Sequence, residues 1–195
     1  MIKQILFQPF ERFSEWKLFI FGLVGVTLAT LLTYYHHVLF LGSLKLVNNH
    51  PKEWYICLVN VSMTILANTA VLYFYALCCN IKTRLIDVIN VVLIAHWAVY
   101  ALGILMVIPF VKNALTEVSL MVLGNELETN GLPVDLSLIL VGVGLFSLLF
   151  LFYFFYLTVV GMRIATNSKK KLNSVIVVIL VLLLNTILQY INPYL

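Results

Sequence analysis

The sequence predicts an all-α membrane protein, a bundle of about five transmembrane helices with its N-terminus inside the cytoplasm and its C-terminus outside. Composition is the first observation behind this class. Hydrophobic residues fill 63% of the 195 positions and charged residues only 10%, with a mean hydropathy of +1.05, whereas a soluble domain carries about 25% charged residues. Five apolar runs are the second observation, since each is long enough to cross a hydrocarbon core of roughly 30 Å as a helix.

Each predicted span is an apolar run bounded by charged, proline-containing or glycine-containing segments. Continuous apolarity favours helices over a transmembrane barrel, whose strands alternate over about ten residues. No repeat or linker divides the chain, so we expect a single transmembrane domain over residues 18–195. Gly22, Gly25 and Ala29, and Gly142 with Gly144, are expected to let helices approach closely. The predicted spans are 18–41, 54–79, 85–111, 136–162 and 172–191.

The basic residues predict how these spans are oriented. With the N-terminus inside, nine of the 12 Lys and Arg residues fall in cytoplasmic segments and three fall outside. Basic loops stay on the cytoplasmic side, so five spans place the C-terminus outside. The inside group is Lys3, Arg12, Lys17, Lys82, Arg84, Arg163, Lys169, Lys170 and Lys171, and the outside group is Lys45, Lys52 and Lys112.

The segments between spans carry further expectations. Residues 1–17 are predicted to form a cytoplasmic interfacial segment, because their apolar residues recur at roughly helical spacing around Pro9 with charges between them. The alternative is a simple flank that anchors the first span through Trp16 and Lys17. Outside, residues 42–53 are predicted to form a short polar link, and residues 112–135 a long loop with a surface helix over 114–124.

Polar residues within the spans are the candidate functional residues. Asn60, Thr64 and Asn68 recur every fourth position on the second span, and Asn185 and Gln189 share a face of the fifth. Such groups are costly in lipid unless they are paired inside a bundle. Two interpretations stay open: amides that hydrogen-bond one helix to another, and a polar path for transport.

The chemistry that an enzyme or ion pump would need is missing from the sequence. No Asp, Glu, Lys or Arg lies near the middle of a predicted span, which disfavours an ion-coupled carrier. No HExxH or GxSxG motif occurs, and a hidden site on His36, His37 and Asp87 would have to reach across the bilayer. We therefore expect no catalytic, cofactor-binding or metal-binding residue and no cofactor.

The last inside loop carries the strongest cluster of positive charge, Lys169, Lys170 and Lys171. These lysines are candidate contacts for lipid headgroups; their other interpretation is a determinant of topology. Because the basic residues of the chain lie near helix ends, where anionic headgroups meet them, no nucleic acid is expected as a partner.

Three short segments carry a family resemblance. Residues 7–13 contain Pro9-x-x-x-Phe13 before the first span, residues 108–110 place Pro109 at the end of the third, and residues 157–171 leave the fourth through Gly-x-Arg, a polar turn and lysines. Together they resemble bacterial members of the Yip domain family, five-span membrane proteins named for interaction with Rab-type GTPases. The Asp-Leu-Tyr-Gly-Pro signature of eukaryotic members and their long cytoplasmic N-terminal region are missing, which counts against a GTPase-binding role and leaves that link open.

These observations predict a non-enzymatic, Yip-like integral membrane protein that acts as a scaffold or adaptor, or in membrane organisation or trafficking. The alternative is a small transporter or channel subunit with a polar path along the second span. The expected partners are membrane lipids and other membrane proteins, or further copies of the chain. The predicted location is the bacterial inner membrane, or the ER or Golgi membrane for a eukaryotic source.

Overall fold

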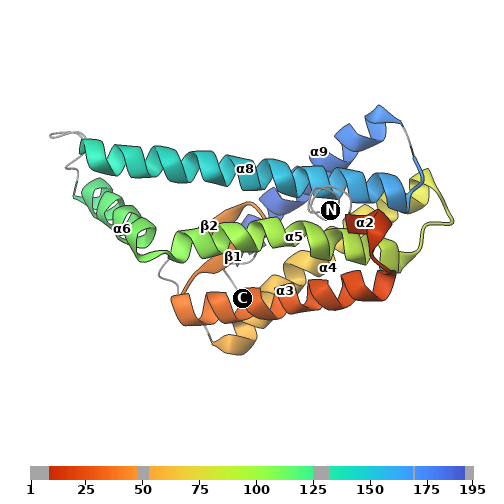
Figure 1. Ribbon diagram of the computed structural model, residues 1–195, viewed down its shortest axis with the longest axis horizontal. Coiled ribbons are helices and arrows are strands. Elements are labelled where there is room, and N and C mark those ends of the chain that lie inside the picture. Colours follow the sequence, from red (N-terminus) through yellow and green to blue (C-terminus); the bar gives the residue numbers. More distant parts are fainter. Residues whose placement is uncertain (1–8, 48–52, 125–131, 169, 192–195) are drawn as a thin grey trace.

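The computed structural model describes residues 9–47, 53–124, 132–168 and 170–191, and over these residues it confirms the all-α class (Figure 1). Five helices are long and apolar enough to cross a membrane. Two shorter helices and a two-stranded sheet complete the described part of the chain. The five long helices are α3 (Glu15–His36), α4 (Trp54–Cys79), α5 (Leu85–Val107), α8 (Val134–Ala165) and α9 (Lys171–Ile191), and the short ones are α2 (Pro9–Arg12) and α6 (Pro109–Leu123).

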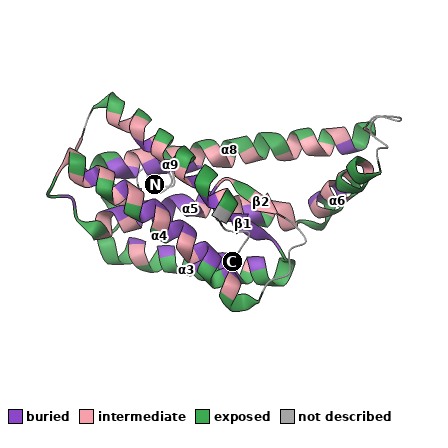
Figure 2. Cartoon of the chain, turned by 180° about the vertical axis from the view of Figure 1, so that it is seen from behind, coloured by how far each residue is buried: buried purple, intermediate pink, exposed green. Residues whose placement is uncertain are grey.

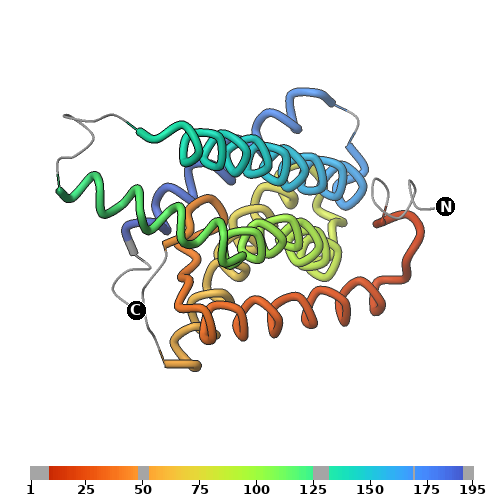
Figure 3. Tube along the Cα trace, turned by 60° about the vertical axis from the view of Figure 1, so that its left-hand side comes forward, coloured from red at the N-terminus to blue at the C-terminus, as the bar shows by residue number. Residues whose placement is uncertain are grey.

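Helix α5 forms the centre of the bundle. It packs against α3, α4 and α8, while α4 also contacts α3 and α9, and α9 contacts α8. Helices α3, α4, α9 and α8 therefore form an arc whose two ends, α3 and α8, lie on either side of α5 (Figure 3). Burial is concentrated on α5, and exposed residues cover the outward faces of its neighbours (Figure 2). We call the opening between α3 and α8 along α5 the seam.

The bounds of the long helices confirm some predicted spans and correct others. The second span, 54–79, matches α4, and the fifth, 172–191, matches α9 closely. The third prediction, 85–111, was wrong at its end: α5 stops at Val107 because Pro109 has no amide hydrogen to continue the helix and instead starts α6. Helix α6 begins before the predicted surface helix 114–124 but covers most of it.

Helix α8 is longer than the predicted span 136–162. Its 32 residues correspond to about 48 Å, well beyond the roughly 30 Å of a hydrocarbon core. Its first turns extend past the other helices and pack against α6 (Figure 1). A Cβ added to Gly142 or Gly144 would meet no atom of the described residues within 4 Å. The expectation that these two glycines let helices approach closely was therefore wrong.

The small residues of α3 behave as predicted. A Cβ on Gly22 would lie 2.5 Å from Leu93 Cβ, and one on Gly25 would lie 2.9 Å from the Trp97 ring, while Ala29 is buried. At these positions the backbone of α3 therefore packs directly against side chains of α5.

The first predicted span, 18–41, was wrong at its outer end. Helix α3 stops at His36, and His37 adopts the left-handed conformation with φ of 56°. The chain then turns back as an antiparallel hairpin, in which β1 (Leu39–Leu41) pairs with β2 (Lys45–Val47). All of β1 is buried, against α4 and α9. Residues 42–47 are thus part of a re-entrant hairpin rather than of the predicted polar link, and non-helical backbone is tolerated at this depth where protein covers it.

The described part of the predicted segment 1–17 begins with a single helical turn, α2, and ends in the first residues of α3. Pro9 is buried, and Phe10 packs beside Val91 and Gly161, where a Cβ on the glycine would lie 3.0 Å from the Phe10 ring. Trp16, at the start of α3, is 70% exposed. Residues 1–8 of the predicted segment lie outside the described residues.

Candidate functional site

The polar stripe of α4 faces the interior of the bundle. Asn60, Thr64 and Asn68 are each at most 3% exposed. The Thr64 hydroxyl donates to the Asn60 carbonyl oxygen at 3.1 Å, and Asn68 Nδ2 donates to the Thr64 carbonyl oxygen at 2.8 Å. Both bonds lie within α4. They satisfy the Thr64 hydroxyl and one hydrogen of the Asn68 amide, but they do not connect α4 to another helix. Among the described residues, Asn68 Oδ1 accepts a hydrogen bond from another helix.

Asn185 on α9 makes that connection. Its side chain is fully buried, and its Nδ2 donates to Asn68 Oδ1 at 3.1 Å and to the Val181 carbonyl oxygen at 2.8 Å. Gln189, predicted to share this role, is half-buried and makes no hydrogen bond to any described residue. The structure therefore brings Asn68 and Asn185 together and leaves Gln189 apart.

The re-entrant hairpin supplies two contacts that the sequence did not indicate. The backbone amide of Ser43 donates to Asn185 Oδ1 at 2.7 Å, and the Ser43 hydroxyl lies 2.8 Å from His96 Nε2 on α5. His96 Nδ1 lies 2.7 Å from the Val92 carbonyl oxygen, which can only accept. A neutral ring with its hydrogen on Nδ1 satisfies both bonds, and Ser43 is then the donor to Nε2.

We call Asn68, Asn185, Ser43 and His96 the polar junction. It joins one residue from each of α4, α9, the hairpin and α5. Gly42, whose φ is +69°, makes room for it, because a Cβ there would lie 2.8 Å from Asn185 Oδ1. A cavity of about 180 Å³ between α5 and α8 reaches Ser43. The junction fixes a loop and three helices against one another.

The junction uses neither Thr64, which bonds within α4, nor Asn60. Both atoms of its side-chain amide are buried and have no partner among the residues that the structure describes. Buried amides without partners are uncommon and costly. The position therefore has unused hydrogen-bonding capacity, in the second turn of α4.

A second polar group lies at the end of the bundle where α3 and α5 begin, and the sequence did not indicate that its members meet. The Arg84 guanidinium pairs with both oxygens of Asp87, at 2.9 and 3.1 Å, and with Glu15 of α3. These hydrogen bonds, to Asp87 first and then to Glu15, raise the pKa of Arg84. Asn90 Nδ2 donates to the Glu15 carbonyl oxygen at 3.1 Å, which ties α5 to the start of α3.

The remaining predicted residues do not come together as a site among the described residues. Lys170 and Lys171 are exposed at the start of α9, and Lys169 lies outside the described residues. His36 and Asp87 stand at opposite ends of the bundle, on the last turn of α3 and the first turn of α5. Within the described ranges no three His, Cys, Asp or Glu side chains converge as a metal site would require.

No family model, no curated protein and no solved structure matches the chain. The resemblance to the Yip domain family therefore stays a prediction from the sequence, and the function has to be inferred from the geometry.

Proposed function

We propose that this integral membrane protein is a non-enzymatic scaffold, whose partners are lipids and other membrane proteins. The polar junction supports the proposal. The Asn185 side chain hydrogen-bonds to Asn68 and to the Ser43 amide, and the Ser43 hydroxyl hydrogen-bonds to His96. Interhelical hydrogen bonds in membranes hold helices in place, and a scaffold needs a surface whose helices do not shift.

The outward faces of the helices are suited to apolar partners. Large apolar side chains are exposed along α3, α4, α8 and α9, and Figure 2 shows this exposed layer around the buried α5. A membrane protein of this kind meets lipid tails and partner helices through such faces. Examples from α8 are Leu138, Val141, Leu145, Leu149 and Phe152.

Crosslinking within the membrane tests the scaffold. A photoreactive residue at Leu149, which is 63% exposed, should capture a defined membrane protein, whereas one at Phe154, which is 2% exposed, should not. The captured protein is then tagged and used to recover this chain in the reverse experiment. Failure of the reverse experiment contradicts the scaffold proposal.

Two further results would overturn it. One is saturable movement of a defined solute by the purified protein in liposomes. The other is covalent labelling of Ser43 by a fluorophosphonate that disappears in Ser43→Ala, because a hydroxyl bonded to an imidazole is also how a nucleophile and its base are arranged.

The second candidate is a small transporter or channel subunit, and Asn60 is the observation that favours it. A buried amide without a described partner could line a path for a polar solute. If flux is found, Asn60→Leu should reduce it while Leu66→Ala, on the exposed face of α4, should not. Flux that persists unchanged in Asn60→Leu would eliminate the path along α4.

A further inference from the structure

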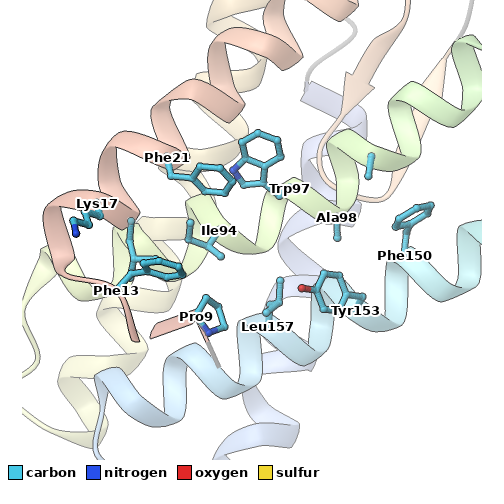
Figure 4. Close-up of a pocket in the computed structure, with 12 residues that line it drawn as sticks. Pro9, Phe13, Lys17, Phe21, Ile94, Trp97, Ala98, Phe150, Tyr153 and Leu157 are labelled. Carbon is cyan, nitrogen blue, oxygen red and sulfur yellow. The ribbon is translucent and has the colours of Figure 1, made fainter. Parts of the chain in front are cut away.

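The seam between α3 and α8 contains an apolar groove of about 500 Å³ (Figure 4). Its floor is buried and consists of Ile94 and Ala98 of α5 and Leu157 of α8. On the α3 side, Phe21 stacks on Trp97 with ring centroids 4.5 Å apart. The volume lies within the range of about 300–1,000 Å³ that ligand sites occupy, and the lining predicts an apolar occupant.

The cytoplasmic end of this groove is different. Pro9 of α2 and Phe13 narrow it there, and Lys17 of α3 stands beside Phe13 (Figure 4). Beyond Phe13 and Leu18, which line both spaces, lies a second cavity of about 570 Å³. The two cavities therefore adjoin, one apolar and one at the membrane surface.

The second cavity has a surplus of acceptors. Glu15, Asp87 and Arg84 all line it, and together they carry a formal charge of one negative, because one guanidinium is shared by two carboxylates. Asn90 also lines it, is 3% exposed, and its Oδ1 has no partner within the described ranges. An occupant with hydrogen-bond donors and positive charge would satisfy these groups. Lys17, at the mouth of the apolar groove, would attract negative charge.

We propose that the seam binds one phospholipid of the cytoplasmic leaflet whose headgroup carries a phosphate and a primary ammonium, as phosphatidylethanolamine does. The acyl chains lie in the groove along α5, and the phosphate faces Lys17. The ammonium lies in the second cavity, against the carboxylates of Glu15 and Asp87 and the free acceptor of Asn90. This site is independent of the scaffold role.

The shape of the seam favours a lipid over a helix of another protein. A helix 10–12 Å across fills about 500 Å³ in a single turn, and α2 blocks the cytoplasmic end that a transmembrane partner would have to pass. An acyl chain, by contrast, enters from the side and ends where the polar cavity begins.

Selectivity must come from the headgroup. The bilayer that surrounds a lipid tail is as apolar as the groove. Moving a tail into the groove therefore gives no hydrophobic free energy that would favour one lipid over another. Exposed charge contacts each contribute a modest amount. The phosphate is common to phosphatidylethanolamine, phosphatidylglycerol and phosphatidylcholine, so the preference rests on the ammonium. Its contacts with the carboxylates and with Asn90 Oδ1 together correspond to a preference of roughly threefold to tenfold for phosphatidylethanolamine.

Fluorescence of Trp97 reports directly on the groove. The chain has three tryptophans, so Trp16→Phe with Trp54→Phe leaves Trp97 alone. The full-length protein is reconstituted in vesicles of unlabelled phosphatidylcholine. One brominated lipid is then added in increasing amounts: phosphatidylethanolamine, phosphatidylglycerol or phosphatidylcholine. Brominated phosphatidylethanolamine should reach half-maximal quenching at a mole fraction roughly threefold lower than the other two.

Three variants locate the contacts. Ala101→Phe, which fills the groove, should abolish the preference, and Ala70→Phe, on an exposed position of α4, should leave it unchanged. Glu15→Gln, which removes one of the carboxylates that face the ammonium, should reduce it to less than twofold. Melting temperatures of all variants are compared with the parent to separate blocked binding from loss of fold.

The alternatives give different readings. Equal quenching by all three lipids overturns the proposal, as does a preference for phosphatidylglycerol, which carries no ammonium. Quenching by phosphatidylcholine equal to that by phosphatidylethanolamine also overturns it, because a quaternary ammonium has no hydrogen to donate to Asn90. A preference that survives in a folded Ala101→Phe protein would place the lipid elsewhere.

Discussion

Replacing Asn185 by leucine should be the most damaging polar substitution in the bundle. Leucine has a similar volume but neither donates nor accepts. The change removes the bond from Asn185 Nδ2 to Asn68 Oδ1 and the bond from the Ser43 amide to Asn185 Oδ1. The hairpin and α4 would both lose their side-chain hydrogen bonds to α9 but would keep their packing against it.

The size of the effect follows from these two bonds. Hydrogen bonds between elements of a membrane protein contribute about 0.6 kcal/mol on average and up to about 1.7 kcal/mol. The Ser43 amide is also left buried without an acceptor, and an orphaned buried group costs about 1–3 kcal/mol. We expect Asn185→Leu to lower the free energy of unfolding by about 2–4 kcal/mol.

Reversible unfolding by SDS in mixed micelles measures this difference. The matched control is Thr186→Val, the next residue of α9, whose exposed hydroxyl bonds only to Leu182 of its own helix. Its effect should stay within about 0.5 kcal/mol. If Asn185→Leu proved as mild as the control, the junction would not hold the bundle together and the reasoning behind the scaffold would fail.

Three further predictions use the same unfolding measurement. Gly22→Ala should destabilise by about 1–3 kcal/mol, since its Cβ would lie 2.5 Å from Leu93 Cβ, whereas Gly142→Ala should be neutral or stabilise by up to about 1 kcal/mol; equal effects would contradict the packing of α3 on α5. Gly42→Ala should cost at least about 1–2 kcal/mol, from its φ of +69° and its contact with Asn185, and a neutral result would argue against the hairpin turn. In a double-mutant cycle, Ser43→Ala and His96→Phe should couple by about 0.6–1.7 kcal/mol, and strict additivity would mean that the two side chains do not meet.

The sequence was sufficient for the number of spans and for the bounds of α4 and α9, because the bilayer imposes a length. The apolar run from Trp54 ends where the polar residues after Cys79 begin, and α4 has these bounds. The end of α5 was harder to place, because Phe110 and Val111 remain apolar and only Pro109 marks the change of element.

The hairpin could not be separated from the helix by hydropathy. Val38 to Leu41 continue the apolar run of α3, and a short buried strand has the same composition as the last turn of a buried helix. The available signal was local: aromatic and β-branched residues, then Gly42 and Ser43, then the alternation of Lys45 to Val47.

The candidate site was predicted in part for the same reason. Amides on α4 and α9 stood out as polar positions in apolar runs, and Asn68 and Asn185 do meet. Ser43 and His96 had no such signal, because their contact depends on a hairpin that returns into the bundle. Gln189 shares the sequence pattern of Asn185 but sits a turn further on, past the hairpin tip.

The bond between Ser43 and Asn185 also sets an order of assembly. The two residues are 142 positions apart, so the hairpin leaves the ribosome long before the helix that receives its amide. Until α9 is inserted, the Ser43 amide lacks the acceptor that it has in the folded bundle, and lipid supplies none. We therefore expect nascent chains that stop before α9 to keep the hairpin outside the hydrocarbon core, so that the hairpin reaches its mature position only once α9 has inserted.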